Sequence, residues 1–162
     1  VQGVWRDAWS HHIPRLMVLS NIAALLDVDP RELTDWFWVA YMDAYDWVVE
    51  PNVLGMGTYA TGPLMTTKPY VSGAGYIARM SDYCQACAFD PRHSCPLTQL
   101  YWAYLARHEA AFSRNQRMGV VMSALRKRSA AQRRDDETTF ERVRERLIRG
   151  ERIDQPSLDW RD

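Results

Sequence analysis

Hydrophobic positions follow helical spacing along most of the chain. Residues 13–28 are apolar on nearly every side, which predicts a buried helix with Pro14 in its first turn. A second helix is expected to begin after Asp29, whose side chain can cap it, and to end near Val49, before Pro51. No segment shows the alternation of a credible strand, so the pattern predicts an all-α fold.

The later part of the chain divides into segments of different character. Residues 52–76 are rich in Gly, Thr and Pro and favour an irregular loop with short helical turns, of the kind that wraps a ligand. Residues 97–117 predict another amphipathic helix. From about Ser123 the chain is charged, with a narrow apolar stripe that ends at Gly150, which indicates one or two surface helices. The last residues, 151–162, are expected to be loose.

Composition and charge narrow the class of protein. The 162 residues suffice for one domain with a core, and the formal net charge of zero provides no overall basic field for nucleic acid, although residues 126–134 are locally basic. No signal peptide or membrane span is visible, so a cytoplasmic protein is expected, and the start at Val1 suggests a piece of a longer chain. Seven Trp and eight Tyr suggest stacking or electron transfer, although core packing explains them equally well.

One carboxylate falls among large aromatic side chains. On the second predicted helix, Asp43 lies seven residues after Trp36 and four before Trp47. A carboxylate beside such rings is not cleanly in solvent, and it needs a cation or hydrogen-bond donors. We therefore expect Asp43 to have a basic partner.

The three cysteines lie within twelve residues. Cys84 and Cys87 form a C-x2-C pair, and Cys95 is followed by Pro96. Three thiols cannot form closed disulfide pairs, and they leave a tetrahedral metal site one ligand short. His93 would complete a zinc site, a fourth cysteine from elsewhere would complete an iron–sulfur cluster, and three reduced structural thiols are the remaining alternative.

Four blocks of sequence, in this order, resemble the deoxyribodipyrimidine photolyase-related family, which comprises the iron–sulfur bacterial cryptochromes and (6-4) photolyases. The blocks are HHIPRLMVLSN, WFWVAYMDAYDWVVEPNVLGMGTYATG, TKPYVSGAGYIARMSDYCQAC and CPLTQLYWAYLARH. The resemblance covers roughly residues 5–118. It implies the C-terminal half of a helical FAD-binding domain over 1–118, with its N-terminal part missing, followed by a charged helical tail over 119–162.

The resemblance also implies cofactors. Members carry FAD, a 4Fe–4S cluster held by four cysteines, and a lumazine-type antenna in a separate N-terminal domain, which is therefore possible here. Cys84, Cys87 and Cys95 match three cluster ligands, and the fourth would lie just before Val1. The segment between the second and third of these cysteines is shorter than in many relatives.

Other matched positions imply catalytic and flavin-binding roles. His12 matches the active-site histidine that donates a proton to the lesion, and His11 lies beside it. Arg15 would pair with Asp43 over the isoalloxazine ring and stabilise negative charge on the reduced flavin. From the residues alone, a satisfied histidine and an ordinary interhelical ion pair explain the same pattern.

The loop after the second helix carries further implied contacts with the flavin or the lesion. Asn52, Gly55 and Met56 would line the pocket, with Gly55 allowing close approach of the backbone. Val49 occupies the position that faces flavin N5, where many relatives carry a polar residue.

Contacts with DNA and an electron-transfer route are implied as well. Lys68 would hold a phosphate and Tyr70 would contact the flipped base. Trp36 and Tyr45 match electron-transfer aromatics, whereas Phe37 stands where relatives can carry Tyr and is harder to oxidise. Packing is the alternative role for all these rings.

The resulting hypothesis is a light-driven DNA repair flavoprotein, a lyase that passes an electron from reduced FAD to a pyrimidine photoproduct, in particular a (6-4) product. We expect UV-damaged DNA as its partner, no membrane partner and a monomer. The fragment alone is expected to be inactive. The alternatives are a blue-light photoreceptor of the same fold without repair activity and a zinc-stabilised helical module that binds DNA or protein.

Overall fold

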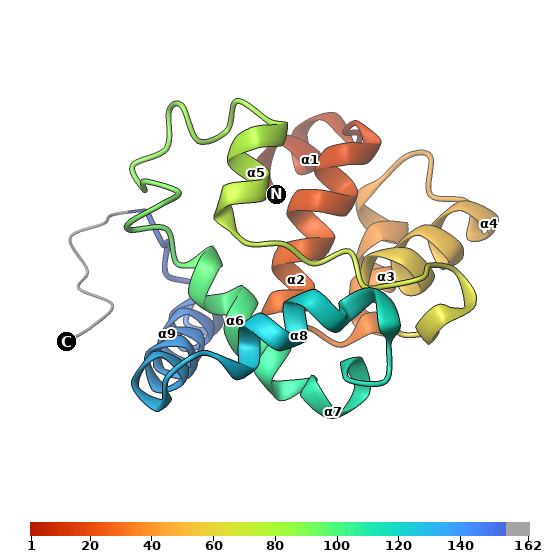
Figure 1. The fold of residues 1–162 in the computed structure, drawn as a ribbon. Helices are drawn as coiled ribbons and strands as arrows, with labels where there is room; N and C mark the ends of the chain where they lie inside the picture. The colour runs from red at the N-terminus through yellow and green to blue at the C-terminus, as the bar shows by residue number, and fades with distance from the viewer. Residues whose placement is uncertain (155–162) are drawn as a thin grey trace. The chain divides into compact units, whose positions relative to one another are not determined.

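The computed structural model describes residues 1–154, and within that range the chain is helical and contains no strand (Figure 1). The all-α prediction is confirmed. The chain forms two compact units, Val1–Val71 and a second that begins at Ser72. The expected functional division at residue 118 is a different boundary and stays a prediction. Most of the segment expected to be loose, residues 155–162, lies outside the described part.

The first unit contains short helices and two π-helical segments. In chain order they are α1 (Gln2–Asp7), η1 (Pro14–Ser20), α2 (Asn21–Leu25), α3 (Pro30–Ala40), α4 (Asp46–Val49), η2 (Glu50–Gly57) and the 3-10 turn η3 (Gly62–Leu64). The predicted first helix corresponds to η1 and α2. The irregular segment expected from residue 52 instead begins after η2.

Helix α3 begins where the sequence predicted and ends earlier. The Asp29 carboxylate accepts hydrogen bonds from the backbone N–H groups of Arg31 and Glu32, at 2.8 and 3.1 Å, and thereby caps the first turn. The predicted end near Val49 is wrong, because Tyr41 leaves the helix with extended backbone angles of −118° and 134°. Its hydroxyl meets Ser10 and its ring contacts the Arg15 guanidinium, both outside α3, and these contacts override the helical periodicity.

Pro51 does not end a helix, which corrects the second expected boundary. It lies in the first turn of η2, directly after Glu50. Proline lacks a backbone N–H and its ring clashes with the preceding turn of an α-helix. The change from α to π spacing at Glu50 accommodates it, so the helical path continues to Gly57.

The core of the first unit is formed by apolar residues of α1, α3, α4 and η2, together with Tyr41. Helix α3 packs against η2 and α4, and η1 also packs against η2. Burial of these side chains supplies the main stabilising contribution of the unit. The buried members are Val4, Leu33, Phe37, Ala40, Tyr41, Val49 and Val53.

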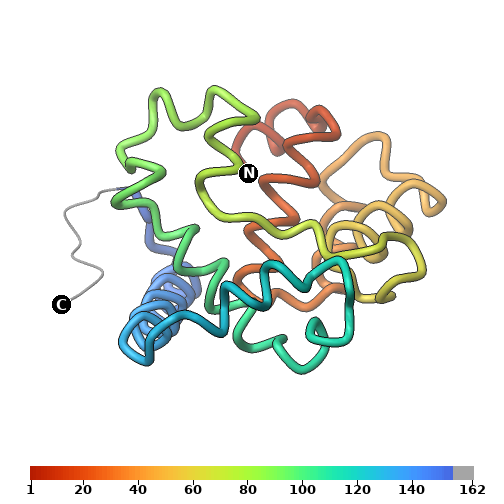
Figure 2. Tube along the Cα trace, viewed as in Figure 1, coloured from red at the N-terminus to blue at the C-terminus, as the bar shows by residue number. Residues whose placement is uncertain are grey.

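The second unit contains the C-terminal helices and a long irregular segment. Its elements are α5 (Ala74–Met80), α6 (Leu97–Arg107), α7 (Glu109–Phe112), η4 (Gln116–Met118), α8 (Gly119–Arg126) and α9 (Ala130–Ile148). Helix α6 packs along α9. Figure 2 shows the chain between α5 and α6, residues 81–96, as a trace without a regular helix. The single helix expected over 97–117 is interrupted at His108.

Helices α8 and α9 occupy the tail that was expected to carry one or two surface helices, although α8 begins at Gly119, before Ser123. Ser129 and Gln132 form a reciprocal capping box at the start of α9, and Gly150, with a positive φ of 73°, follows its end as predicted. Phe140 and Val143 are buried, whereas Leu147 and Ile148 of the expected stripe are exposed. No helix within residues 1–154 is long and apolar enough to cross a membrane.

Candidate functional site

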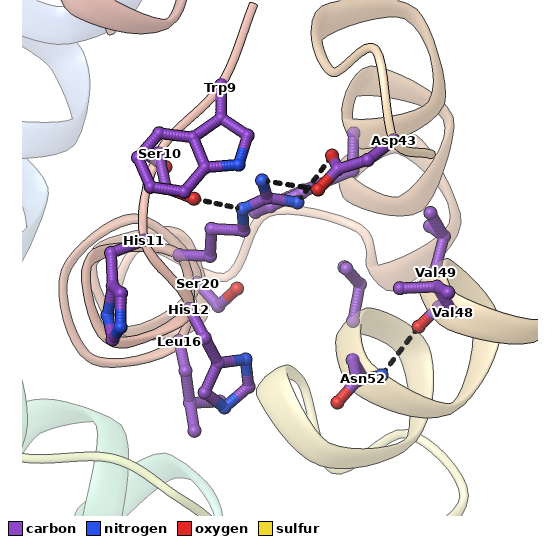
Figure 3. A pocket seen from close by; sticks show the side chains of 13 residues that line it. Trp9, Ser10, His11, His12, Leu16, Ser20, Asp43, Val48, Val49 and Asn52 are labelled. Atoms are coloured by element: carbon purple, nitrogen blue, oxygen red, sulfur yellow. Dashed lines mark hydrogen bonds and ion pairs between the residues drawn. The ribbon is translucent and has the colours of Figure 1, made fainter. Parts of the chain in front are cut away.

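A pocket of about 290 Å³ lies within the first unit (Figure 3). Six of the residues predicted to form the site line it together: His11, His12, Arg15, Asp43, Val49 and Asn52. They come from the connection into η1 and its first turn, from the break after α3 and from the α4–η2 segment. The remaining lining residues are Trp9, Ser10, Leu16, Ser20, Phe37, Val48 and Val53.

A two-point ion pair forms one edge of the pocket. The Arg15 Nη1 and Nη2 groups donate to Asp43 Oδ1 and Oδ2, each at 2.9 Å. Arg15 Nε donates to the Ser10 carbonyl oxygen at 2.7 Å, and the guanidinium lies 4.1 Å from the centre of the Tyr41 ring. Asp43 therefore has a basic partner, held in a bidentate pair.

The ion pair favours the charged form of Asp43. The hydrogen bond from Arg15 holds the pKa of the Asp43 carboxyl below its ordinary value, and burial opposes this effect more weakly. The carboxylate remains 43% exposed, whereas Arg15 is largely covered. A ligand in the pocket therefore meets a fixed carboxylate held by a nearly buried guanidinium.

The break between α3 and α4 places Asp43 at the pocket. Met42 donates its backbone N–H to the Ala8 carbonyl at 3.0 Å, and the Tyr45 N–H bonds to the Asp43 carbonyl at 3.1 Å. These bonds replace helical ones over residues 41–45. The early end of α3 is thus the local feature that turns the Asp43 carboxylate toward η1.

The two histidines differ in their surroundings. The Nδ1 atom of His11 accepts a hydrogen bond of 3.3 Å from the Ile13 N–H. For the ring of His12, no hydrogen-bond partner occurs among residues 1–154, and both histidines are exposed. In Figure 3 the His12 ring lies on the side of η1 nearer Asn52, and the His11 ring lies on the other side. Both ring nitrogens of His12 can therefore form a hydrogen bond with a ligand in the pocket.

The other walls of the pocket are mainly apolar. Val48, Val49 and Phe37 face it, and the Asn52 side-chain amide donates to the Val48 carbonyl at 2.7 Å (Figure 3). The Asn52 amide oxygen has no partner within the described chain and can accept a hydrogen bond from a ligand. The pocket is therefore an apolar slot with an ion pair and an amide at its edge.

Two of the predicted contact residues, Gly55 and Met56, do not line the pocket. A Cβ atom on Gly55 would lie 2.6 Å from Met65 Cγ, so this glycine accommodates the Met65 side chain. Met56 is partly buried. Their contact with a flavin or a lesion stays a prediction.

The predicted electron-transfer residues occupy different environments. The Trp36 ring is partly buried, with its centroid 5.2 Å from that of Phe37 and 6.2 Å from that of the exposed Trp5. Because Phe37 lines the pocket, Trp36 is one ring removed from it. Tyr45 is 60% exposed and stacks on Trp47 with centroids 6.0 Å apart.

Lys68 and Tyr70 lie outside the pocket lining, and both are exposed. The Thr66 hydroxyl donates to the Lys68 carbonyl at 3.0 Å, which fixes the backbone of this part of the loop. Exposed side chains on an irregular segment can meet DNA, and the predicted contacts with phosphate and base remain predictions.

The cysteines lie in the irregular segment of the second unit. Cys84 and Cys95 are partly buried and Cys87 is exposed. Burial raises the pKa of the Cys95 thiol to about 11, and the neighbouring thiols of Cys84 and Cys87 together with Asp90 add to the increase. The three thiols thus share one irregular segment, residues 81–96.

The described residues nevertheless contain no group of three His, Cys, Asp or Glu side chains arranged to hold a metal ion. The thiols have the right chemistry for an iron–sulfur cluster without the convergent geometry. The alternatives of cluster, zinc and structural thiols all stay predictions.

No family model matches the chain. Over 117 residues it is 44% identical to a (6-4) photolyase of Agrobacterium fabrum, a match that covers 69% of this chain and 23% of that protein. The identity supports membership of the photolyase family. An uncharacterized protein of Acanthamoeba polyphaga mimivirus is 39% identical over 66 residues, which is 41% of this chain and 54% of that protein.

The chain thus spans about a quarter of the photolyase and about half of the viral protein. Several pocket residues of this photolyase-like chain were missed by the sequence analysis, among them Trp9 and Ser10. Ser10 contributes a backbone carbonyl, which sequence patterns do not reveal. Trp9 lies between predicted elements, where no periodicity marks it.

Proposed function

We propose that the chain is part of a light-driven DNA repair flavoprotein, a lyase that acts on a pyrimidine photoproduct, in particular a (6-4) product. The observation that carries this proposal is the Arg15–Asp43 pair at the edge of an apolar slot beside His12. The match to a (6-4) photolyase supports the same class of activity. The relationship to photolyases itself rests on that identity.

The proposed roles follow from the chemistry of the side chains. Bound FAD in its reduced form would supply the electron. Arg15 and Asp43 would hold the flavin edge, with the guanidinium stabilising negative charge there. Val49 and Phe37 would pack on the ring and exclude water. Carrying a proton on its ring, His12 would act as the acid toward the photoproduct.

Two further parts of the proposal concern the DNA and the cluster. Lys68 would hold a phosphate and Tyr70 would contact the extruded base. Cys84, Cys87 and Cys95 would hold a 4Fe–4S cluster together with a fourth cysteine outside this sequence. The position of all three cysteines within twelve residues of sequence supports this assignment.

The test uses the protein in its full natural length, with wild type, His12→Ala and the matched variant His11→Ala. We expect bound FAD, and light-dependent repair of DNA that carries a defined (6-4) product. Loss of a general acid costs about 10²–10⁴-fold in rate, so His12→Ala should lose at least about 100-fold, whereas His11→Ala should lose much less. Equal rates for wild type and His12→Ala would contradict the assigned role.

The other functional classes give different results in the same preparation. Protein that binds FAD and repairs neither (6-4) products nor cyclobutane dimers in light would be a photoreceptor. Protein without flavin that contains one zinc ion would be the zinc-stabilised module. Iron and acid-labile sulfide, both lost in Cys84→Ser, would support the cluster.

A further inference from the structure

A side-chain hydrogen bond joins two segments that border the pocket. The Ser10 Oγ and Tyr41 hydroxyl oxygens lie 2.8 Å apart, although the residues are 31 positions apart in the chain. Tyr41 is only 5% exposed, and its ring stacks on Phe37 with centroids 5.1 Å apart. The Tyr41 hydroxyl is therefore held in one place by the core and presents a fixed anchor to Ser10.

The same serine also holds the flavin-facing arginine. The Ser10 carbonyl accepts the Arg15 Nε–H at 2.7 Å, while the two Nη groups of Arg15 bind Asp43. The Arg15 guanidinium also lies over the Tyr41 ring, with its Cζ atom 4.1 Å from the ring centre. The polar contacts of the Arg15 head within the described chain thus lead to Ser10 or to the segment that contains Tyr41 and Asp43.

Ser10 lies directly before the two histidines of the pocket. The connection between α1 and η1, residues 8–13, contains few hydrogen bonds of its own, so its hydrogen bonds to residues 41 and 42 determine its path. The first hydrogen bond runs from the Met42 N–H to the Ala8 carbonyl at 3.0 Å, and the second joins Ser10 and Tyr41. The second hydrogen bond fixes the chain two residues before His12.

We propose that the Ser10–Tyr41 hydrogen bond is a positioning device, which fixes the Arg15 guanidinium and the His11–His12 turn relative to each other before a ligand enters the pocket. Tyr41 and Ser10 are positioning residues in this scheme and do not touch the ligand through their hydroxyl groups. A preformed arrangement lowers the ordering cost of binding. The inference rests on the proposed function in one respect, that the ligand is FAD.

The binding test compares FAD dissociation constants of the full-length protein. Net loss of one neutral hydrogen bond corresponds to about a 2- to 10-fold change in an equilibrium constant. We expect Tyr41→Phe and Ser10→Ala each to weaken FAD binding by about that factor. Because both remove the same bond, the double variant should bind no more weakly than either single one. The matched control Tyr101→Phe, which removes the hydroxyl of a partly buried tyrosine outside the pocket lining, should bind FAD like wild type.

A second measurement needs no ligand. The Arg15 Nε–H signal is assigned in arginine-labelled protein by its loss in Arg15→Lys, and its exchange with water is measured. Its bond to the Ser10 carbonyl should protect it in wild type and in Tyr101→Phe, and exchange should be faster in Tyr41→Phe. Unchanged exchange in Tyr41→Phe overturns the inference, whether or not FAD binds. Faster exchange with an unchanged dissociation constant also overturns it, because the bond would then be purely structural.

The two proposals fail in different ways. Wild-type protein that does not bind FAD refutes the proposed function, and the exchange measurement still decides whether Ser10 and Tyr41 hold Arg15.

Discussion

Gly57 determines how closely the two helical segments that form opposite walls of the pocket can approach. It is buried at the end of η2, and a Cβ atom at this position would lie 2.9 Å from Ser20 Cβ and 3.0 Å from Ser20 Oγ, both in η1. The Asn52 carbonyl would lie at 3.3 Å. Since neither Cβ nor backbone can rotate away, Gly57→Ala must move η1 and η2 apart.

The packing cost of Gly57→Ala can be separated from the higher intrinsic helix propensity of alanine. Overpacking a close contact costs about 1–3 kcal/mol. Replacing glycine by alanine in a helix returns up to about 1 kcal/mol, which partly conceals that cost. Gly3→Ala is the matched control: it lies near a helix end in the same unit, with no atom within 4 Å of the added Cβ. The difference between the two variants is therefore the packing cost itself.

Urea unfolding of wild type, Gly57→Ala and Gly3→Ala measures this difference. We expect Gly57→Ala to be about 1–3 kcal/mol less stable than Gly3→Ala. In a Ser20→Gly background, where the contacting Cβ and Oγ are absent, Gly57→Ala should cost less than in wild type. Equal unfolding free energies for the two alanine variants, or an undiminished cost in the Ser20→Gly background, would refute the steric explanation.

Three further predictions concern charge and electron transfer. The pKa of Asp43 is lower in the folded protein than in the unfolded chain. Ionised Asp43 therefore stabilises the folded state above the unfolded-state pKa of about 3.9, and this stabilisation is lost as the pH falls through the lower folded-state pKa. The urea midpoint should therefore fall more steeply in acid for wild type than for Asp43→Asn. Asp136, which is 2% exposed, binds Arg128 through two hydrogen bonds, so Asp136→Ala should lose about 3 kcal/mol in urea unfolding at neutral pH, whereas joint replacement by Leu and Met should be nearly neutral. If Trp36 carries electrons, Trp36→Phe should lower the yield of flavin photoreduction measured by transient absorption, and an unchanged yield would remove it from the route.

Sequence patterns predicted those features of the fold that depend on neighbouring residues. Asp29 caps α3, Pro14 begins η1 and Gly150 follows α9, because capping and positive φ are local properties. The end of α3 could not be predicted in this way. Apolar spacing continues past Ala40, and the Tyr41 side chain that leaves the helix is held by a residue 31 positions away.

The site shows a similar division. The aromatic neighbours of Asp43 indicated a basic partner, and the family resemblance indicated which arginine it was; the structure brings the two together. Ser10 acts through its backbone carbonyl and through a hydroxyl that meets Tyr41, and neither contact leaves a trace in composition or spacing. The three thiols do not converge on a metal site within residues 1–154, because their arrangement depends on the path of an irregular segment, which periodicity does not describe.

The surroundings of Tyr41 also decide which part it can take in the proposed electron route. Its ring lies 6.1 Å from Trp36 and 5.1 Å from Phe37, so distance alone would allow it to carry an electron past the phenylalanine. The Arg15 guanidinium at 4.1 Å opposes this, because removing an electron from the ring would place two positive charges in contact. Burial also raises the pKa of the Tyr41 phenol, which makes deprotonation more costly. The contacts that suit Tyr41 to position Arg15 therefore make it a poor electron carrier, and a route from Trp36 to the pocket must cross Phe37.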